Sequence, residues 1–221
     1  MLRTLSLALA LCVTCLGSSH AVDVDLFGNL GSVNTSTDSV TVGYITSGIE
    51  NQFESQGFSV GSTAYVLSRI DLGLQSFGSP SPVVSIYTDA ANEPGTPLAA
   101  FTTTSTVASK QVYSFTGSFT LSANTSYWIV LSNSNSASIE RYDWYTNDAS
   151  TPPSAINGSG FTYLLSKERD NVGGTWDPAN MPNLSINLAG TAVPEPSTYA
   201  LGLIATGVLA AMARRRKART A

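Results

Sequence analysis

Residues 64–75 read Ala-Tyr-Val-Leu-Ser-Arg-Ile-Asp-Leu-Gly-Leu-Gln, and the period of this stretch decides the fold class. On an extended strand, the odd-numbered positions from Tyr65 to Asp71 fall on one face, and the even-numbered positions from Val66 to Leu74 fall on the other. Such a two-residue period indicates a strand with one side against a core and one side toward water. It therefore predicts a β protein.

Short strand-like segments recur on both sides of this stretch, separated by turn signals such as Thr151-Pro152-Pro153. We expect strands at 64–75, 82–87, 98–102, 111–119, 126–132, 138–145, 160–167 and 184–189. The region is rich in Ser, Thr, Val, Tyr and Phe, and it shows no convincing helical stripe away from the two ends. We therefore predict an all-β fold, with a single jelly-roll-like β-sandwich domain over residues 22–192.

The N-terminal residues 1–21 have the features of a signal peptide, with a positive residue, an apolar stretch and small residues before a cut. We expect signal peptidase to cleave after Ala21. This cleavage removes Cys12, Cys15 and His20, which are both cysteines and the only histidine of the chain. The exported part then lacks the side chains for a Ser-His-Asp triad, a Cys-His pair, a histidine zinc site or a disulfide.

The C-terminal residues 193–221 have three parts: Val-Pro-Glu-Pro-Ser at 193–197, an apolar run over 198–213, and a basic end at 214–221. The two prolines cannot join a helix or a central strand, so the first part should be extended and accessible. The apolar run predicts one short transmembrane helix. Four adjacent cations stop it on the cytoplasmic side: Arg214, Arg215, Arg216 and Lys217. We expect a precursor anchored in the inner membrane with the β domain outside.

This three-part tail resembles the PEP-CTERM sorting signal of Gram-negative bacteria, whose processing enzyme is the membrane-embedded exosortase. The resemblance implies that the chain is an exosortase substrate of an exopolysaccharide-producing bacterium. It also implies that four residues are recognised by the enzyme: Val193, Pro194, Glu195 and Pro196. The processed protein would then reach the cell surface or the extracellular matrix of a biofilm.

The middle of the chain resembles a second family, the choice-of-anchor R domain. The likeness rests on five segments: Gln-Gly-Phe at 56–58, Gly-Ser-Thr-Ala-Tyr at 61–65, Val-Ser-Ile-Tyr-Thr-Asp at 84–89, Pro-Gly-Thr-Pro-Leu-Ala at 94–99 and Leu-Ser-Ala-Asn-Thr-Ser-Tyr-Trp at 121–128. It covers residues 52–132. That family is a bacterial surface module found ahead of PEP-CTERM and other anchors. The resemblance implies an extracellular β-sandwich and brings no assigned activity.

The exported part is strongly acidic. Residues 22–197 hold all fifteen Asp and Glu residues and five basic ones, which gives a net charge of −10. The five basic residues are Arg69, Lys110, Arg141, Lys167 and Arg169. Binding to nucleic acid needs clustered lysine and arginine to neutralise phosphates, so we expect no nucleic-acid partner.

Carboxylates are the reactive groups that remain, and they could hold calcium or act as an acid–base pair. Three groups stand out in the sequence: Glu140, Asp143 and Asp148; Asp89, Asn92 and Glu93; and Glu168, Asp170, Asn171 and Asp177. None has the ligand spacing of a calcium loop, and Asp and Asn at strand ends commonly form turns. We expect no enzyme activity, no metal and no cofactor, with calcium as the open alternative.

Aromatic residues suggest a binding surface. In Arg-Tyr-Asp-Trp-Tyr at 141–145, Tyr142 and Trp144 share one strand face, and the opposite face could be wet. An exposed aromatic ring beside carboxylates could stack on a sugar. The possible glycan contacts are therefore Asp143, Tyr145 and Trp176. Most strand tryptophans are core residues, so packing is the competing interpretation. Trp128 lies in a segment that is apolar on both faces, which predicts a central strand.

Two functions follow from these patterns. The first is a non-catalytic surface or matrix protein that exosortase sorts and processes. The alternative is a module that binds exopolysaccharide through exposed aromatic rings. An enzyme acting on glycans is a distant third interpretation.

Overall fold

The computed structural model describes residues 22–30, 38–45, 49–77, 82–133, 141–146, 151–171, 173–179, 183–194 and 207–208. The expected signal peptide with Ala21, most of the expected membrane helix and the basic end lie outside these residues. Within the described part of the chain, no helix has both the length and the apolar character needed to cross a membrane.

The elements named in these residues are thirteen strands. Their bounds are β1 (Val24–Gly28), β2 (Ser39–Ile45), β3 (Ile49–Ser59), β4 (Tyr65–Phe77), β5 (Pro82–Asp89), β6 (Pro94–Phe101), β7 (Gln111–Leu121), β8 (Ser126–Asn133), β9 (Arg141–Tyr145), β10 (Ser154–Ala155), β11 (Thr162–Asp170), β12 (Asp177–Pro178) and β13 (Ile186–Ala192). All of their ladders are antiparallel. The predicted all-β class is confirmed.

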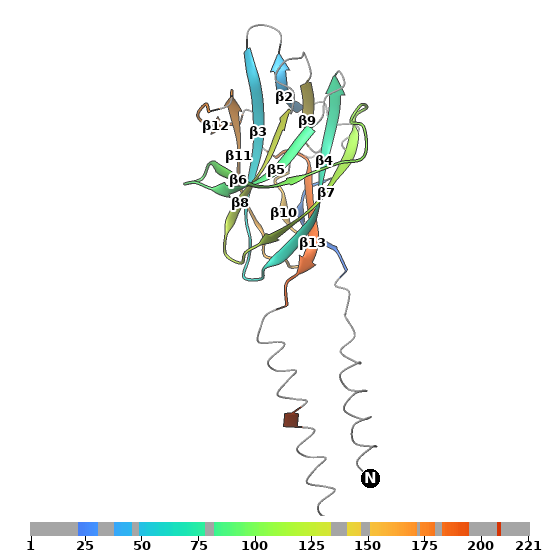
Figure 1. The fold of residues 1–221 in the computed structure, drawn as a ribbon, viewed down its shortest axis with the longest axis vertical. Helices are drawn as coiled ribbons and strands as arrows, with labels where there is room; N and C mark the ends of the chain where they lie inside the picture. The colour runs from blue at the N-terminus through green and yellow to red at the C-terminus, as the bar shows by residue number, and fades with distance from the viewer. Residues whose placement is uncertain are drawn as a thin grey trace, which may run out of the picture.

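Two long strands, β3 and β4, organise the sheet and run along the length of the domain (Figure 1). β4 pairs with β7 on one edge, and with β13 and then β9 on the other. β3 pairs with β11 on one edge, and with β8 and β2 on the other. We call β3, β5, β6, β8, β11 and β12 the β3 half, and β1, β4, β7, β10 and β13 the β4 half.

The two halves belong to one connected sheet that folds over a common core. The β2–β9 ladder links them, and a bridge between Thr102 and Thr116 brings β6 beside β7. Across the interior, the Phe27 and Phe58 rings lie 5.7 Å apart between centroids, as do the Phe119 and Tyr127 rings. Rings at this spacing attract each other and bury large apolar areas, so they fix how the halves face one another.

β4 buries its side chains in a different pattern from the predicted alternation. In its ladder with β13, Leu67 lies opposite Gly190 and Arg69 lies opposite Ala189. Ser68 is therefore an extra residue on β4, which marks a β-bulge. Because a bulge inserts one extra residue, the inward face changes from odd to even positions. Tyr65 and Leu67 before the bulge, and Ile70 and Leu72 after it, therefore all join the core. The strand is confirmed, but the prediction of a single apolar face from Val66 to Leu74 is wrong.

A second, smaller apolar cluster lies on the other face of the β3 half. It contains Phe53, Trp128, Val130 and Trp176, whereas Ile129 of β8 points into the main core. Residues 127–131 of β8 are all buried, which confirms the predicted central strand. Gly57 lies opposite Trp128, and a Cβ atom there would come within 3.0 Å of the indole ring. The glycine therefore leaves the space into which this ring packs.

Candidate functional sites

The sorting segment begins where the last strand ends. β13 finishes at Ala192, and the amide of Val193 donates a hydrogen bond to the carbonyl oxygen of Ala64 at 2.9 Å. Pro194 is exposed, whereas the predicted recognition residues Glu195 and Pro196 lie outside the described residues. The recognition segment is therefore joined to the folded domain without an intervening linker.

The first described residues lie beside this exit. β1 pairs with β13 in antiparallel register, with Val24 opposite Gly190. The chain therefore enters the domain at Val22 and leaves it at Val193 on the same end, which is the lower end in Figure 1. Both expected processing sites adjoin this end.

Tyr145, a predicted glycan contact, is buried. Only 7% of its surface is exposed, its hydroxyl donates a hydrogen bond to Gln75 Oε1 at 2.7 Å, and Lys110 Nζ lies 4.1 Å from its ring centroid. Burial, and secondarily the Asp143 carboxylate, raises the pKa of the Tyr145 hydroxyl. The prediction of an exposed stacking ring at Tyr145 is wrong. Lys110 lies against the ring face, and the side-chain amide of Gln75 binds the hydroxyl.

Asp143, the second predicted contact, lies on the same strand face as Tyr145. It is half-buried and accepts a hydrogen bond from Thr41 Oγ1 at 3.2 Å. Burial raises the pKa of Asp143, although the Arg141 charge and hydrogen bonds from Thr41 and Ser39 oppose this shift. Tyr142 and Trp144 face the core, as the two-residue period predicts.

Trp176, the third predicted contact, is also buried, with 7% of its surface exposed. It packs in the cluster of Trp128, so the prediction that these two tryptophans occupy different environments is wrong. The Arg169 guanidinium lies 4.5 Å from the ring centroids of both Phe53 and Trp176. Such cation–π contacts stabilise a partly buried arginine, and they fill the space that a sugar ring would need.

The three predicted glycan contacts do not form one surface. Asp143 and Tyr145 lie on β9, which pairs with β2 and β4. Trp176 instead precedes β12 and covers β3 and β8. The loop that carries Trp176 covers an apolar cluster. This tryptophan is therefore buried, although its neighbours in the sequence are polar.

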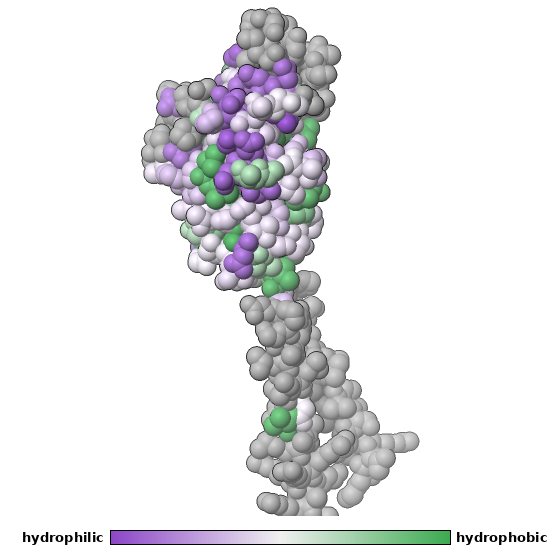
Figure 2. All heavy atoms as spheres, turned by 90° about the vertical axis from the view of Figure 1, so that its left-hand side faces the viewer, coloured by the Kyte–Doolittle hydropathy of each residue, from purple (hydrophilic) through white to green (hydrophobic). Residues whose placement is uncertain are grey.

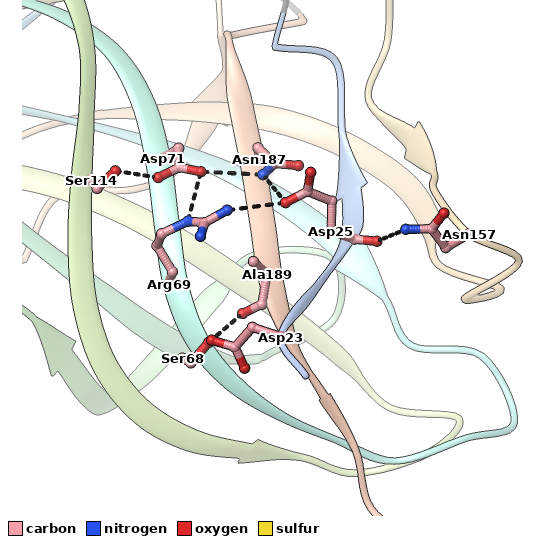
Figure 3. A network of polar contacts seen from close by, with 9 residues as sticks. All are labelled: Asp23, Asp25, Ser68, Arg69, Asp71, Ser114, Asn157, Asn187 and Ala189. Carbon is pink, nitrogen blue, oxygen red and sulfur yellow. Dashed lines mark hydrogen bonds and ion pairs between the residues drawn. The ribbon is translucent and has the colours of Figure 1, made fainter. Parts of the chain in front are cut away.

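A polar network crosses the outer face of the β4 half (Figure 3). Asp71 of β4 accepts hydrogen bonds from Ser114 Oγ at 2.6 Å, from Arg69 Nε at 3.0 Å and from Asn187 Nδ2 at 3.2 Å. Asp25 of β1 accepts from Arg69 Nη2 at 3.1 Å and from Asn187 Nδ2 at 2.8 Å. Four neighbouring strands are therefore tied together by side chains as well as by their backbones.

An open cavity of about 390 Å³ adjoins this network. Its lining includes Asp25, Arg69, Asp71 and Asn187, together with Gly28, Asn29, Leu30 and Ile156. Carboxylate, guanidinium and amide groups present both donors and acceptors there. No local pattern predicts this site, because its polar residues are spread over β1, β4 and β13 and come together only through strand pairing.

Glu54 is a buried carboxyl group on β3. It has no measurable exposure, and neither of its oxygens has a hydrogen-bond partner among the described residues. Burial, together with the negative charges of Glu168 and Asp170, raises the pKa of Glu54 to about 9. The group is therefore neutral at pH 7. Its side chain does not reach the surface of the described part of the chain.

The carboxylate groups considered for calcium have other partners. Asp89 accepts a hydrogen bond from the Trp128 indole at 2.8 Å, and Glu93 pairs with Lys167 at 3.4 Å. Asn171 has a positive φ of 71°, as expected for a turn residue. Among the described residues, no three carboxylate, cysteine or histidine side chains are grouped so that they could hold a metal ion. Glu140 and Asp148 lie outside the described residues.

Comparison with known protein families finds one match. Residues 192–217 match the PEP-CTERM protein-sorting motif. This match implies that the chain is exported as a membrane-anchored precursor and sorted by exosortase. A search among curated proteins finds no match.

Proposed function

We propose that the chain is a non-catalytic surface or matrix protein of an exopolysaccharide-producing Gram-negative bacterium. Signal peptidase removes residues 1–21, and exosortase processes the inner-membrane-anchored precursor at the Pro-Glu-Pro segment. The β domain then reaches the cell surface or the extracellular matrix. The observation that carries this proposal is the sorting motif at 192–217, which begins at the last residue of a folded β domain.

The architecture supports a scaffold role. We propose that the folded-over sheet is a jelly-roll-like sandwich and that residues 52–132 belong to a choice-of-anchor R type of surface module. The β3 to β8 strands span this stretch, and its carboxyl group on β3, Glu54, is fully buried. Exposed groups such as Asp25 and Arg69 are bound to each other. These features suit a stable exported module rather than an enzyme.

The test is the intact mass of the exported protein in a host with exosortase and in one without it. The double variant Pro194→Ala/Pro196→Ala should block processing and leave the membrane-anchored precursor. The matched control is Pro97→Ala/Pro152→Ala, which changes two exposed prolines of the β domain. Normal processing of the motif variant, or a mature form that keeps 214–217, would contradict the proposal.

Exopolysaccharide binding is the second candidate function, and the cavity on the β4 half is the observation that favours it. Its mixed donors and acceptors match the hydroxyl groups of a sugar better than the closed aromatic sites do. Asp25→Asn changes one exposed cavity residue, and Asp23→Asn is its control because Asp23 bonds Ser68 outside the cavity. Binding of the exported protein to the host's purified polymer should weaken for Asp25→Asn alone. Equal binding by both variants would contradict this site.

A further inference from the structure

The end of the domain that carries both chain exits has an unusual composition. We define the exit pole as residues 22–24, 60–64, 121–125, 158–161 and 191–193. Strand pairing brings these segments together, because Tyr65 lies opposite both Leu121 and Ala192, and Ser59 lies opposite both Ser126 and Thr162. The exit pole is therefore one continuous end of the sheet.

The loops of the exit pole pack closely on each other. The Val60 amide donates a hydrogen bond to the Thr125 carbonyl at 2.9 Å, and the Asn124 amide donates to the Gly61 carbonyl at 2.8 Å. A Cβ atom on Gly61 would lie 2.9 Å from the Gly160 carbonyl oxygen. Backbone contacts this close leave the loops little freedom, so the exit pole is a formed surface rather than a set of separate loops.

Charge is nearly absent from this surface. The exit pole consists of Gly, Ala, Ser, Thr, Asn and apolar residues, and Asp23 is its single charged residue. Two of its apolar side chains are exposed, Val22 at 77% and Val24 at 41%. On the face shown in Figure 2, strongly hydrophilic residues gather mostly in the upper part, and the lower end of the domain is mostly pale.

The opposite end carries charged side chains. Arg141 and Asp143 lie opposite Phe77 and Gln75 of β4, and Asp170 lies opposite Gln52 of β3. An acidic domain is repelled by anionic lipids, and removing a charge from water is costly. A surface without charges avoids both penalties. The end of the domain with few charged residues is therefore also the end at which the chain enters and leaves it.

The tether is short enough to bring this end to the membrane. Five residues, 193–197, separate β13 from the apolar run at 198–213. They reach at most about 18 Å when fully extended. Before signal cleavage, the other exit at Val22 directly follows the signal peptide. Both ends of the precursor therefore hold the exit pole near the bilayer.

We propose that the exit pole rests on the lipid headgroups of the membrane that holds the precursor, so that the domain stands on the bilayer with its charged end outward. This inference rests on the membrane-anchored precursor of the proposed function. The partner is the lipid surface itself. It orients the domain before exosortase acts on the adjoining segment.

Single cysteines can test this orientation, since the exported part contains none. Ser62 and Ser122 are exposed and report on the exit pole. Ser109 is the matched control, because it is also exposed and lies at the far end of β4. There the carbonyl oxygen of its neighbour Ala108 accepts a hydrogen bond from the Ser76 amide. Nine residue steps of β4 between Tyr65 and Leu74 separate the two ends by about 30 Å. The signal-processed precursor is labelled at Ser62→Cys, Ser122→Cys or Ser109→Cys with a fluorophore. It is then reconstituted in phosphatidylcholine–phosphatidylglycerol vesicles containing headgroup spin-labelled lipid.

We expect quenching at Ser62→Cys and Ser122→Cys and none at Ser109→Cys. Adding Ser122→Glu to the Ser62→Cys protein should reduce its quenching, and high salt should restore it by screening the repulsion. Equal quenching at both ends, or none at the exit pole, overturns the inference. Flotation of the same vesicles tests the anchor separately: a chain that fails to float contradicts the proposed function, whereas one that floats without quenching at the exit pole contradicts only this inference.

Discussion

The outer face of the β3 half is covered by apolar side chains, whereas the outer face of the β4 half is polar and open. On the β3 half, Trp176 packs with Trp128 in a second apolar cluster on the outer face, and Arg169 lies against the Trp176 ring. On the β4 half, Asp25, Arg69, Asp71 and Asn187 form a hydrogen-bonded network beside an open cavity. Buried aromatic rings therefore close the outer face of the β3 half, whereas the accessible concave surface of the β4 half is polar.

Among these outer residues, Trp128 should contribute most to the free energy of unfolding. Trp128→Ala should lower the free energy of unfolding by about 3 to 5 kcal/mol, because it empties a fully buried site and strands the Asp89 carboxylate. Trp176→Ala, at the edge of the same cluster, should cost about 1 to 3 kcal/mol. Denaturant unfolding of the exported protein measures both. A negligible effect of Trp128→Ala would contradict the view that the outer face of the β3 half is a packed apolar cluster.

The β3 half should also make the stability of the domain depend on pH through Glu54. Glu54 is neutral in the folded protein up to about pH 9, but it ionises near pH 4.5 when unfolded. The unfolded state therefore binds fewer protons between these values, and stability should fall as pH rises, by up to about 1.4 kcal/mol per pH unit. Glu54→Gln should remove this slope and gain about 2 to 3 kcal/mol at about pH 6.5, with no gain below pH 4.5. Parallel stability profiles of the two proteins over pH 4 to 9 would contradict a neutral buried Glu54.

Within the β4 half, substitution of Asp71 should lower the stability of the domain more than substitution of any exposed member of its network. Its carboxylate is largely buried and accepts three hydrogen bonds, so Asp71→Asn should cost about 1 to 3 kcal/mol. Thermal unfolding of this variant beside Ser114→Ala, which removes one of the three donors, separates the carboxylate from its partner. A larger loss for Ser114→Ala than for Asp71→Asn would reverse this assignment.

The smallest effect should come from Asp25, whose side chain is 48% exposed. Exposed ion pairs contribute little because water and salt screen them, so Asp25→Asn should change stability by only about 0 to 1 kcal/mol. The same thermal scan at low and high salt measures it. A cost equal to that of Asp71→Asn would show that the network acts as one unit, and the cavity residues could not then be changed independently of the fold.

Local patterns in the sequence predict much of the fold but not the site. The period of 64–75 indicates β4, yet the bulge between Leu67 and Arg69 depends on pairing with β13 and leaves no local mark. β3 was not predicted, because Glu54-Ser55-Gln56 breaks its apolar pattern even though all three side chains are buried. Polar neighbours made Trp176 look exposed, since contact with Trp128 arises only through the β11–β3–β8 ladders. The cavity residues are likewise joined by pairing alone.

The position of β13 has a mechanical consequence. This strand lies between β1 and β4, and it leads directly into the tail that holds the precursor. A pull on the tail acts along the axis of β13, so both ladders are loaded in shear and their hydrogen bonds resist together. Peeling from an edge would break them one at a time. A surface protein dragged by flow or by a stretching polymer would therefore transmit force through one of its best-supported strands.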